Sequence, residues 1–109
     1  MKRIVTTGIV LAASLLLSLA SAQAQWTMTQ RTKFLGDCIP ACEGNPNVAP
    51  ALKGQCGLYC TCLANEGEKI FSSADFDEMD EDARTGRANP KTQRFHTLVP
   101  ACNQRAFGQ

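Results

Sequence analysis

Two pairs of cysteines with the same internal spacing constrain this chain more than any other feature of its sequence. Cys38 and Cys42 form one C-x3-C pair, Cys56 and Cys60 form a second, and thirteen residues separate the two pairs. Residues four apart lie on the same face of an α-helix, about 6 Å from each other. In two antiparallel helices joined by a turn, the outer cysteines face each other and so do the inner ones. The spacing therefore predicts a helical hairpin closed by two disulfides, Cys38–Cys60 and Cys42–Cys56.

A third disulfide follows from the two remaining cysteines. Cys62 comes two residues after Cys60, which is about 200° around a helix, so it points away from the hairpin partner. Cys102 is the only cysteine left. We expect a Cys62–Cys102 bridge that fastens a C-terminal helix to the back of the hairpin. Six cysteines allow fifteen full pairings, and these three bridges are a geometric preference among them.

The composition gives these crosslinks a structural role. Leu, Ile, Val and Phe supply 14 of the 85 residues from 25 to 109, about 16%, a level at which chains often stay disordered. Closing a loop of about 14 residues between Cys42 and Cys56 contributes about 3 kcal/mol, and a loop of about 40 residues to Cys102 contributes about 4. Small domains are stable by only about 5–15 kcal/mol in total. We therefore expect the disulfides to decide whether the chain folds.

Apolar residues recur at helical spacing along the chain, and no segment shows the alternation of a strand. The first stripe lies between residues 26 and 42 and is followed by the helix-breaking run 44–50, which contains two prolines and a glycine. The second runs from Leu52 to Ile70, although its three glycines each weaken a helix by about 1 kcal/mol relative to alanine. The expected fold class is all-α, a small disulfide-stapled helical hairpin with one or two additional short helices.

The additional helices have recognisable ends. Ser72 or Ser73 is suited to cap a third helix, and Gly86 to end it. Asn89-Pro90 offers a cap followed by proline at the first helical position. Pro100 should kink or split this last segment near Thr97.

The N-terminus is typical of an export signal. A basic start at Lys2 and Arg3 precedes an apolar run from Ile9 to Ala20, and small residues at alternate positions from 20 to 24 fit a cleavage site. We expect residues 1–24 to be removed, leaving one domain, 25–109, in the periplasm or outside the cell without stable membrane insertion. The net charge of that domain is −1, which argues against nucleic acid as a partner.

Two resemblances extend this interpretation. The twin C-x3-C spacing from Cys38 to Cys60 resembles the small chaperones of the mitochondrial intermembrane space, and it implies their disulfide-stapled hairpin architecture only. Other motifs are similar to those of small exported cysteine-rich proteobacterial proteins of a YCxC type, and this resemblance implies export and a helical fold without pointing to a chemistry. They are Trp26, Phe34-Leu35 with Cys38, and Tyr59-Cys60-Thr61-Cys62 followed by Glu66 and Glu68.

The cysteines and the histidine also allow chemical functions. Cys60, Cys62 and His96 offer thiolate and imidazole ligands for zinc or copper, but the paired C-x2-C knuckles of a zinc site are absent from the sequence. A thiol–disulfide exchanger is expected to show C-x-x-C in a βαβ setting, and the sequence has neither. A Cys–His nucleophile needs a free thiol, and three disulfides leave none.

The acidic run from Asp75 to Asp82 fails the EF-hand pattern, because Asp80 occupies the position at which glycine makes the turn. We interpret it as a solvated helix face with Phe76 and Met79 on its buried side, neutralised by basic residues that follow it: Arg84, Arg87, Lys91 and Arg94. Trp26 is suited either to anchor a partner or to cover the hairpin, and we interpret it as a packing residue.

These observations favour a protein that is not an enzyme and holds no cofactor. We expect a binding or accessory module that acts on another protein in the periplasm or outside the cell. The alternative is a metal-binding or thiol-redox protein of the same compartment.

Overall fold

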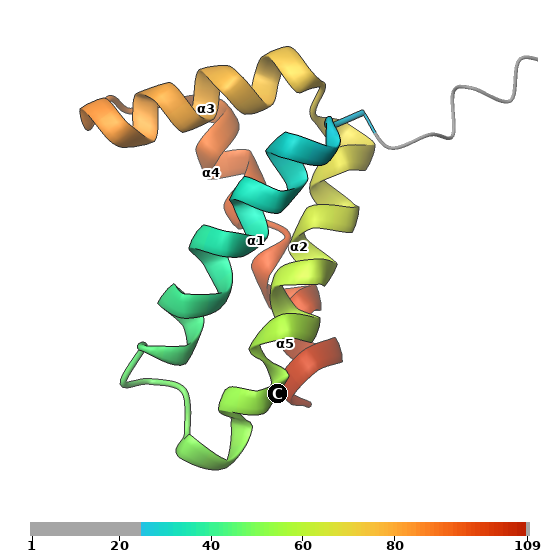
Figure 1. Ribbon diagram of the computed structural model, residues 1–109, viewed down its shortest axis with the longest axis vertical. Coiled ribbons are helices and arrows are strands. Elements are labelled where there is room, and N and C mark those ends of the chain that lie inside the picture. Colours follow the sequence, from blue (N-terminus) through green and yellow to red (C-terminus); the bar gives the residue numbers. More distant parts are fainter. Residues whose placement is uncertain (1–24, 109) are drawn as a thin grey trace, which may run out of the picture.

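The computed structural model describes residues 25–108, which form helices joined by short connections, without a strand in this range (Figure 1). The expected signal peptide, 1–24, lies outside the described residues. In chain order, the elements are α1 (Met28–Glu43), the 3-10 helix η2 (Pro50–Gln55), α2 (Cys56–Ile70), α3 (Ser73–Thr85), α4 (Pro90–His96) and α5 (Val99–Phe107). The all-α prediction is confirmed.

Local side-chain hydrogen bonds fix where the helices begin. At the start of α1, the Thr27 hydroxyl accepts from the Gln30 N–H at 3.0 Å, and the Gln30 amide oxygen accepts from the Thr27 N–H at 2.9 Å. Ser72, rather than Ser73, caps α3 in the same reciprocal way with Asp75. Such a capping box satisfies two backbone donors that have no partner within the helix.

The helix ends also follow local signals. Gly86 ends α3 with φ 72°, a left-handed conformation that costs glycine little. Asn89 caps α4, with Pro90 in its first turn. The predicted break before Pro100 is confirmed, because α4 ends at His96 and Pro100 lies in the first turn of α5.

One expected helix differs from the prediction. The second apolar stripe begins at Leu52, but the structure places Leu52 in η2 and begins α2 at Cys56. Pro50 starts η2, whose short 3-10 turn brings the chain round from α1 into α2. The stripe is therefore divided between two helices.

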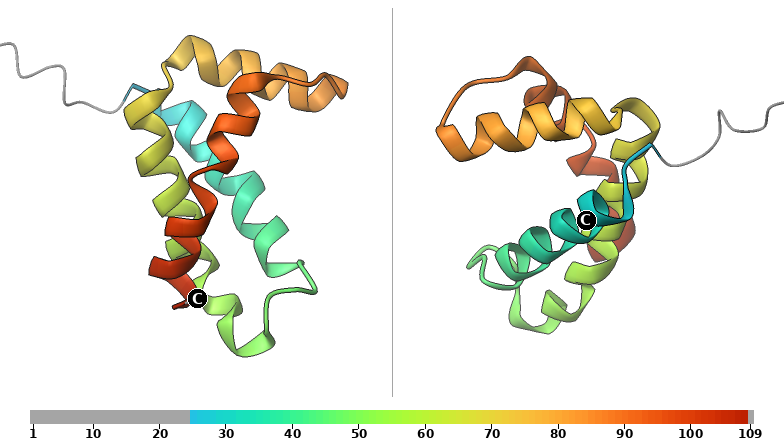
Figure 2. Two further views of the ribbon diagram at one scale, coloured as in Figure 1. Left: turned by 180° about the vertical axis from the view of Figure 1, so that it is seen from behind. Right: turned by 45° about the horizontal axis from the view of Figure 1, so that its top comes forward.

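Three disulfides hold the helices together, and they join the cysteines that helical spacing pairs. Cys38–Cys60 and Cys42–Cys56 link α1 to the hairpin partner α2, and Cys62–Cys102 links the other side of α2 to α5. In the views from behind and above, α4 and α5 cover the back of the hairpin, while α3 lies across the end away from η2 (Figure 2). The hairpin is thus fastened along its length and at its back.

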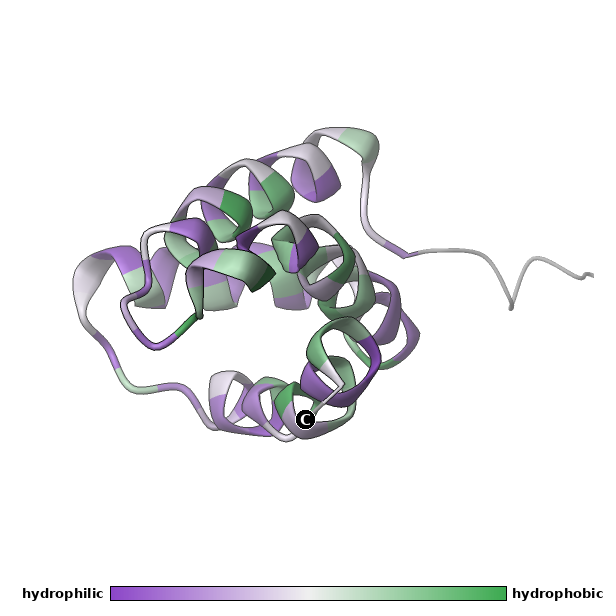
Figure 3. Cartoon of the chain, turned by 90° about the horizontal axis from the view of Figure 1, so that it is seen from below, coloured by the Kyte–Doolittle hydropathy of each residue, from purple (hydrophilic) through white to green (hydrophobic). Residues whose placement is uncertain are grey.

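Apolar packing is divided between the two ends of the hairpin. Trp26, Ala64 and Phe76 are the buried members of one cluster, at the α3 end. Cys42, Cys56 and Cys60 are the buried members of the other, and Leu35 packs against both clusters. Along the helices, hydrophobic and hydrophilic stretches alternate, as expected where one side of a helix faces its neighbours (Figure 3).

Candidate functional site

The alternative metal ligands Cys60, Cys62 and His96 do not form a ligand set. Cys60 is bonded to Cys38 and Cys62 to Cys102, so neither sulfur is a thiolate. His96 is exposed at the end of α4. Within residues 25–108, no group of three or more His, Cys, Asp or Glu side chains is arranged to hold a metal ion.

The acidic helix α3 binds its neighbours through several of its carboxylates. Lys91 of α4 donates to Asp75 at 2.7 Å and to Glu78, while Lys33 of α1 donates to Asp80 at 2.9 Å. These ion pairs join α3 to both α4 and α1. The interpretation as a merely solvated face is therefore incomplete, although most of these carboxylates do keep contact with solvent.

Of the basic residues expected to neutralise α3, Arg84 and Lys91 form ion pairs with its carboxylates, whereas Arg94 packs on an aromatic ring. Arg84 pairs with Asp80 and Glu81 on the same helix, and Lys91 pairs across to α3. Arg94 instead lies over the ring of Phe71, with its guanidinium carbon 5.6 Å from the ring centroid. A cation in that position is attracted to the face of the ring.

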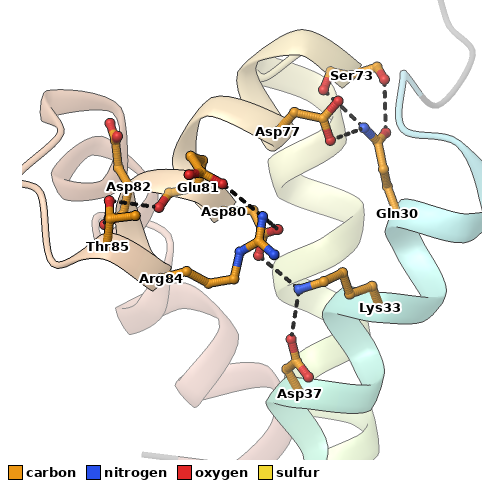
Figure 4. Close-up of polar contacts among 10 residues, drawn as sticks. All are labelled: Gln30, Lys33, Asp37, Ser73, Asp77, Asp80, Glu81, Asp82, Arg84 and Thr85. Carbon is orange, nitrogen blue, oxygen red and sulfur yellow. Dashed lines mark hydrogen bonds and ion pairs between the residues drawn. The ribbon is translucent and has the colours of Figure 1, made fainter.

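Gln30 joins α1 to α3 at the upper end of this contact. Its amide nitrogen donates to the Ser73 carbonyl at 3.0 Å and to Asp77 Oδ1 at 2.9 Å, and its amide oxygen accepts from the Ser73 hydroxyl (Figure 4). The same side chain caps α1. One glutamine therefore fixes both the start of α1 and the position of α3 above it.

Trp26 is a packing residue, as expected. It is 7% exposed, and its indole N–H donates to the Phe71 carbonyl at 3.1 Å. Its ring lies 5.6 Å from Phe34 and 4.8 Å from Phe76, centroid to centroid, at the steep interplanar angles that aromatic pairs prefer. Trp26 therefore joins α1 to α3 and closes the end of the hairpin.

An open apolar cleft of about 300 Å³ lies where α1, α3 and α4 meet. Four of the chain's seven aromatic residues line it, together with aliphatic and polar side chains from the three helices. The lining residues are Trp26, Lys33, Phe34, Asp37, Cys38, Phe76, Met79, Asp80, Ala83, Thr92 and Phe95. This combination of an aromatic wall with a few polar groups is typical of a binding site.

The polar residues of the cleft form an ion-pair chain. Lys33 Nζ lies 2.9 Å from Asp80 Oδ1 and 3.3 Å from Asp37 Oδ2 (Figure 4). The hydrogen bond to Asp80, followed by that to Asp37, raises the pKa of the Lys33 ammonium above its usual value. The Asp37 side chain is 75% exposed, so this rim remains open to a partner.

Sequence reasoning found the packing role of Trp26 and the buried side of Phe76, but it missed the cleft. The meeting of Phe34 and Phe95 depends on how α4 crosses α1, which helical periodicity alone does not show. A ring contact of 5.7 Å between Phe34 and Phe95 joins residues far apart in the chain. The concentration of aromatic residues on three different helices gives no periodic signal.

Comparisons with protein families, with curated proteins and with solved structures find no match to this chain. Among residues 25–108, no helix combines the length and the apolar character needed to cross a membrane. The three disulfides are typical of proteins in an oxidising compartment, such as the periplasm or the extracellular space.

Proposed function

We propose that this protein is an exported, non-catalytic binding module that docks on another protein in the periplasm or outside the cell. The observation that carries the proposal is the open cleft between α1, α3 and α4, in which Phe34 and Phe95 are only half-buried. Aromatic side chains in a preformed pocket are the residues that most often dominate binding energy at protein interfaces.

The scaffold around the cleft supports this role. Two disulfides hold α1 against α2, and side chains from α1 and α4 hold α3 in place. A binding surface on rigid elements loses less conformational entropy when a partner docks. The domain is therefore suited to present the cleft in one fixed shape.

Site-specific crosslinking from the cleft tests the proposal. Ala83 is an exposed residue at the cleft on α3, and Ala74 is an exposed residue of the same helix that does not line the cleft. A photoreactive benzoylphenylalanine is placed at either position, and the protein is irradiated in its native host. We expect a discrete adduct to another protein from position 83 and little from position 74.

Two outcomes would contradict the proposal. If position 83 gives no adduct, or if both positions give the same adducts with equal yield, the cleft is not a docking site. Mass spectrometry of the adduct identifies the contacted protein. Circular dichroism of each purified variant checks that its helical content equals that of the parent chain.

A further inference from the structure

The rim of the cleft carries more negative than positive charge. The charged residues that line the cleft are two carboxylates and one ammonium group, for a net charge of −1 at neutral pH. They are Asp37 and Asp80 on the acidic side and Lys33 on the basic side. Arg84 and Glu81 continue the ion pairs from Asp80 along α3 (Figure 4).

The two cations do not neutralise these carboxylates one by one. Lys33 is shared between Asp37 and Asp80, and Arg84 is shared between Asp80 and Glu81. The carboxylate oxygens beside the cleft can therefore accept hydrogen bonds from further cations.

Asp37 is the most accessible of the acidic groups at the cleft. Its side chain is 75% exposed, and it lines the same cleft as the aromatic rings. Its partner Lys33 lies closer to Asp80, at 2.9 Å, than to Asp37, at 3.3 Å. An incoming ammonium or guanidinium group thus meets a carboxylate whose own cation is already shared.

From this arrangement, and resting on the proposed function, we infer that the cleft binds a basic amphipathic segment of the partner protein. One large apolar side chain of that segment enters the cleft, and Lys or Arg residues beside it pair with Asp37 and the acidic face of α3. The cleft volume of about 300 Å³ is at the lower end of the range for small-molecule pockets, about 300–1,000 Å³. One or two side chains match that space.

The charge also disfavours other occupants. An anionic amphiphile, such as a fatty acid, would bring its carboxylate to a rim that is already negative. A neutral peptide would gain the apolar contact alone. Complementary charge chiefly raises the association rate and excludes wrong partners, so the acidic rim selects for basic sequences.

Peptide selection on the purified, disulfide-bonded protein tests this inference. Phage-displayed random 12-residue peptides are selected on the parent protein and counter-selected on Ala83→Trp, which fills the mouth of the cleft. We expect enriched peptides to contain one aromatic or large aliphatic residue flanked by Lys or Arg. Their binding, measured by fluorescence anisotropy with synthetic peptides, should weaken as the salt concentration rises.

A matched pair of charge reversals identifies the rim. Asp37→Lys reverses a carboxylate at the cleft, whereas Glu43→Lys makes the same change of net charge at the far end of α1. We expect the enriched peptide to bind Asp37→Lys about fivefold more weakly, the size of a single exposed charge interaction. Glu43→Lys should change the affinity by less than about twofold.

The outcomes separate this inference from the proposed function. Enriched peptides that are neutral or acidic, or equal effects of Asp37→Lys and Glu43→Lys, would overturn the basic-segment inference and leave the cleft as a docking site. If no peptide prefers the parent protein to Ala83→Trp, the cleft itself fails as a binding site. Peptides that match this chain's own sequence, together with a dimer in sedimentation that Ala83→Trp dissociates, would make a second copy the occupant and the inference wrong.

Discussion

Gly67 lies in α2 against the rings of Trp26 and Phe95, which leave no room for a side chain at this position. A Cβ at this position would lie 2.9 Å from Phe95 Cε2 and 3.1 Å from two ring atoms of Trp26. Both rings are held by further packing, so they have little freedom to move. The glycine therefore weakens the helix but allows the aromatic cluster to close on α2.

We expect Gly67→Ala to lower the free energy of unfolding by about 1–3 kcal/mol, the usual cost of overpacking. Gly57→Ala in the same helix should raise it by up to about 1 kcal/mol, because alanine favours the helix and no atom lies within 4 Å of the new Cβ. Urea unfolding followed by circular dichroism measures both variants. Changes of the same sign in the two variants would show that close packing at Gly67 is not the cause.

Asp75 connects local helix capping to the contact between α3 and α4. The hydrogen bond from Lys91, followed by the backbone N–H of Ser72, lowers the pKa of Asp75 from 3.8 to about 2. The same contacts with Asp75 and Glu78 raise the pKa of Lys91 above its usual value. Protonation of Asp75 in the folded protein therefore works against two interactions at once.

This depressed pKa gives Asp75 an acid-dependent contribution to stability. The contribution is fully present above about pH 4 and is lost as the pH falls from about 4 to 2, since the unfolded chain binds the proton first. In Asp75→Asn, unfolding free energies measured in urea should fall less steeply across that interval than in the parent chain. Asp37→Asn, at an exposed carboxylate, serves as the control. A parent-like acid slope in Asp75→Asn would contradict this assignment.

At the scale of elements, the effect of proline depends on its position within the helix. Pro90 and Pro100 lie in the first turns of α4 and α5, where the missing N–H has no helical partner to lose. Pro40 lies inside α1 and removes a hydrogen bond from the helix. The disulfides of Cys38 and Cys42 flank it and hold both sides of α1 against α2. The crosslinks thus explain how the helix continues to Glu43.

The C-terminal helix α5 depends on contacts with one face of α2. Cys102 is fully buried in its disulfide with Cys62, and Arg105 Nη1 lies 3.1 Å from Glu66 Oε1. The rings of Tyr59 and Phe107 lie 5.4 Å apart, centroid to centroid. Among these contacts between α2 and α5, only the Cys62–Cys102 disulfide is covalent.

We expect the double variant Cys62→Ala, Cys102→Ala to lose about 2–5 kcal/mol of stability, the usual cost of removing a native disulfide from a small domain. Hydrogen exchange should become faster in α5 before it does in the hairpin of α1 and α2, which keeps its own two disulfides. Exchange measured by mass spectrometry compares the two regions. Equal loss of protection throughout the chain would show that α5 is not a separable element.

At the scale of the molecule, the apolar interior contains two small clusters, and Leu35 packs against both. Each cluster has three buried members, which is a small core for a domain of this length. The sulfur-rich cluster at the η2 end consists, in its buried part, of disulfide cysteines alone. At the η2 end, the cysteines that form the crosslinks are therefore also the buried residues of the core.

Reduction should consequently unfold the protein. In the purified native protein, denatured without reductant, we expect titration to find zero free thiols, consistent with the bonding of all six cysteines. After full reduction, the far-ultraviolet circular dichroism should lose most of its helical signal at neutral pH. Two or more free thiols together with bound zinc or copper would instead favour the metal-binding alternative. A helical signal unchanged by reduction would show that the apolar clusters suffice.

The sequence by itself determined the helical class, the ends of α3 and α4 to within a residue and the preferred pairing of the cysteines, because each depends on spacing within a few residues or within one helical turn. It did not determine the division of the second apolar stripe between η2 and α2. Ser72, Gly86 and Asn89 act on the backbone beside them, and the C-x3-C pairs need only one turn of helix to share a face. The cleft and its acidic rim were decided by the tertiary structure alone. Phe34, Phe76 and Phe95 belong to three helices, and their meeting depends on the crossing of α3 and α4 over α1, which side-chain packing sets and no local pattern encodes.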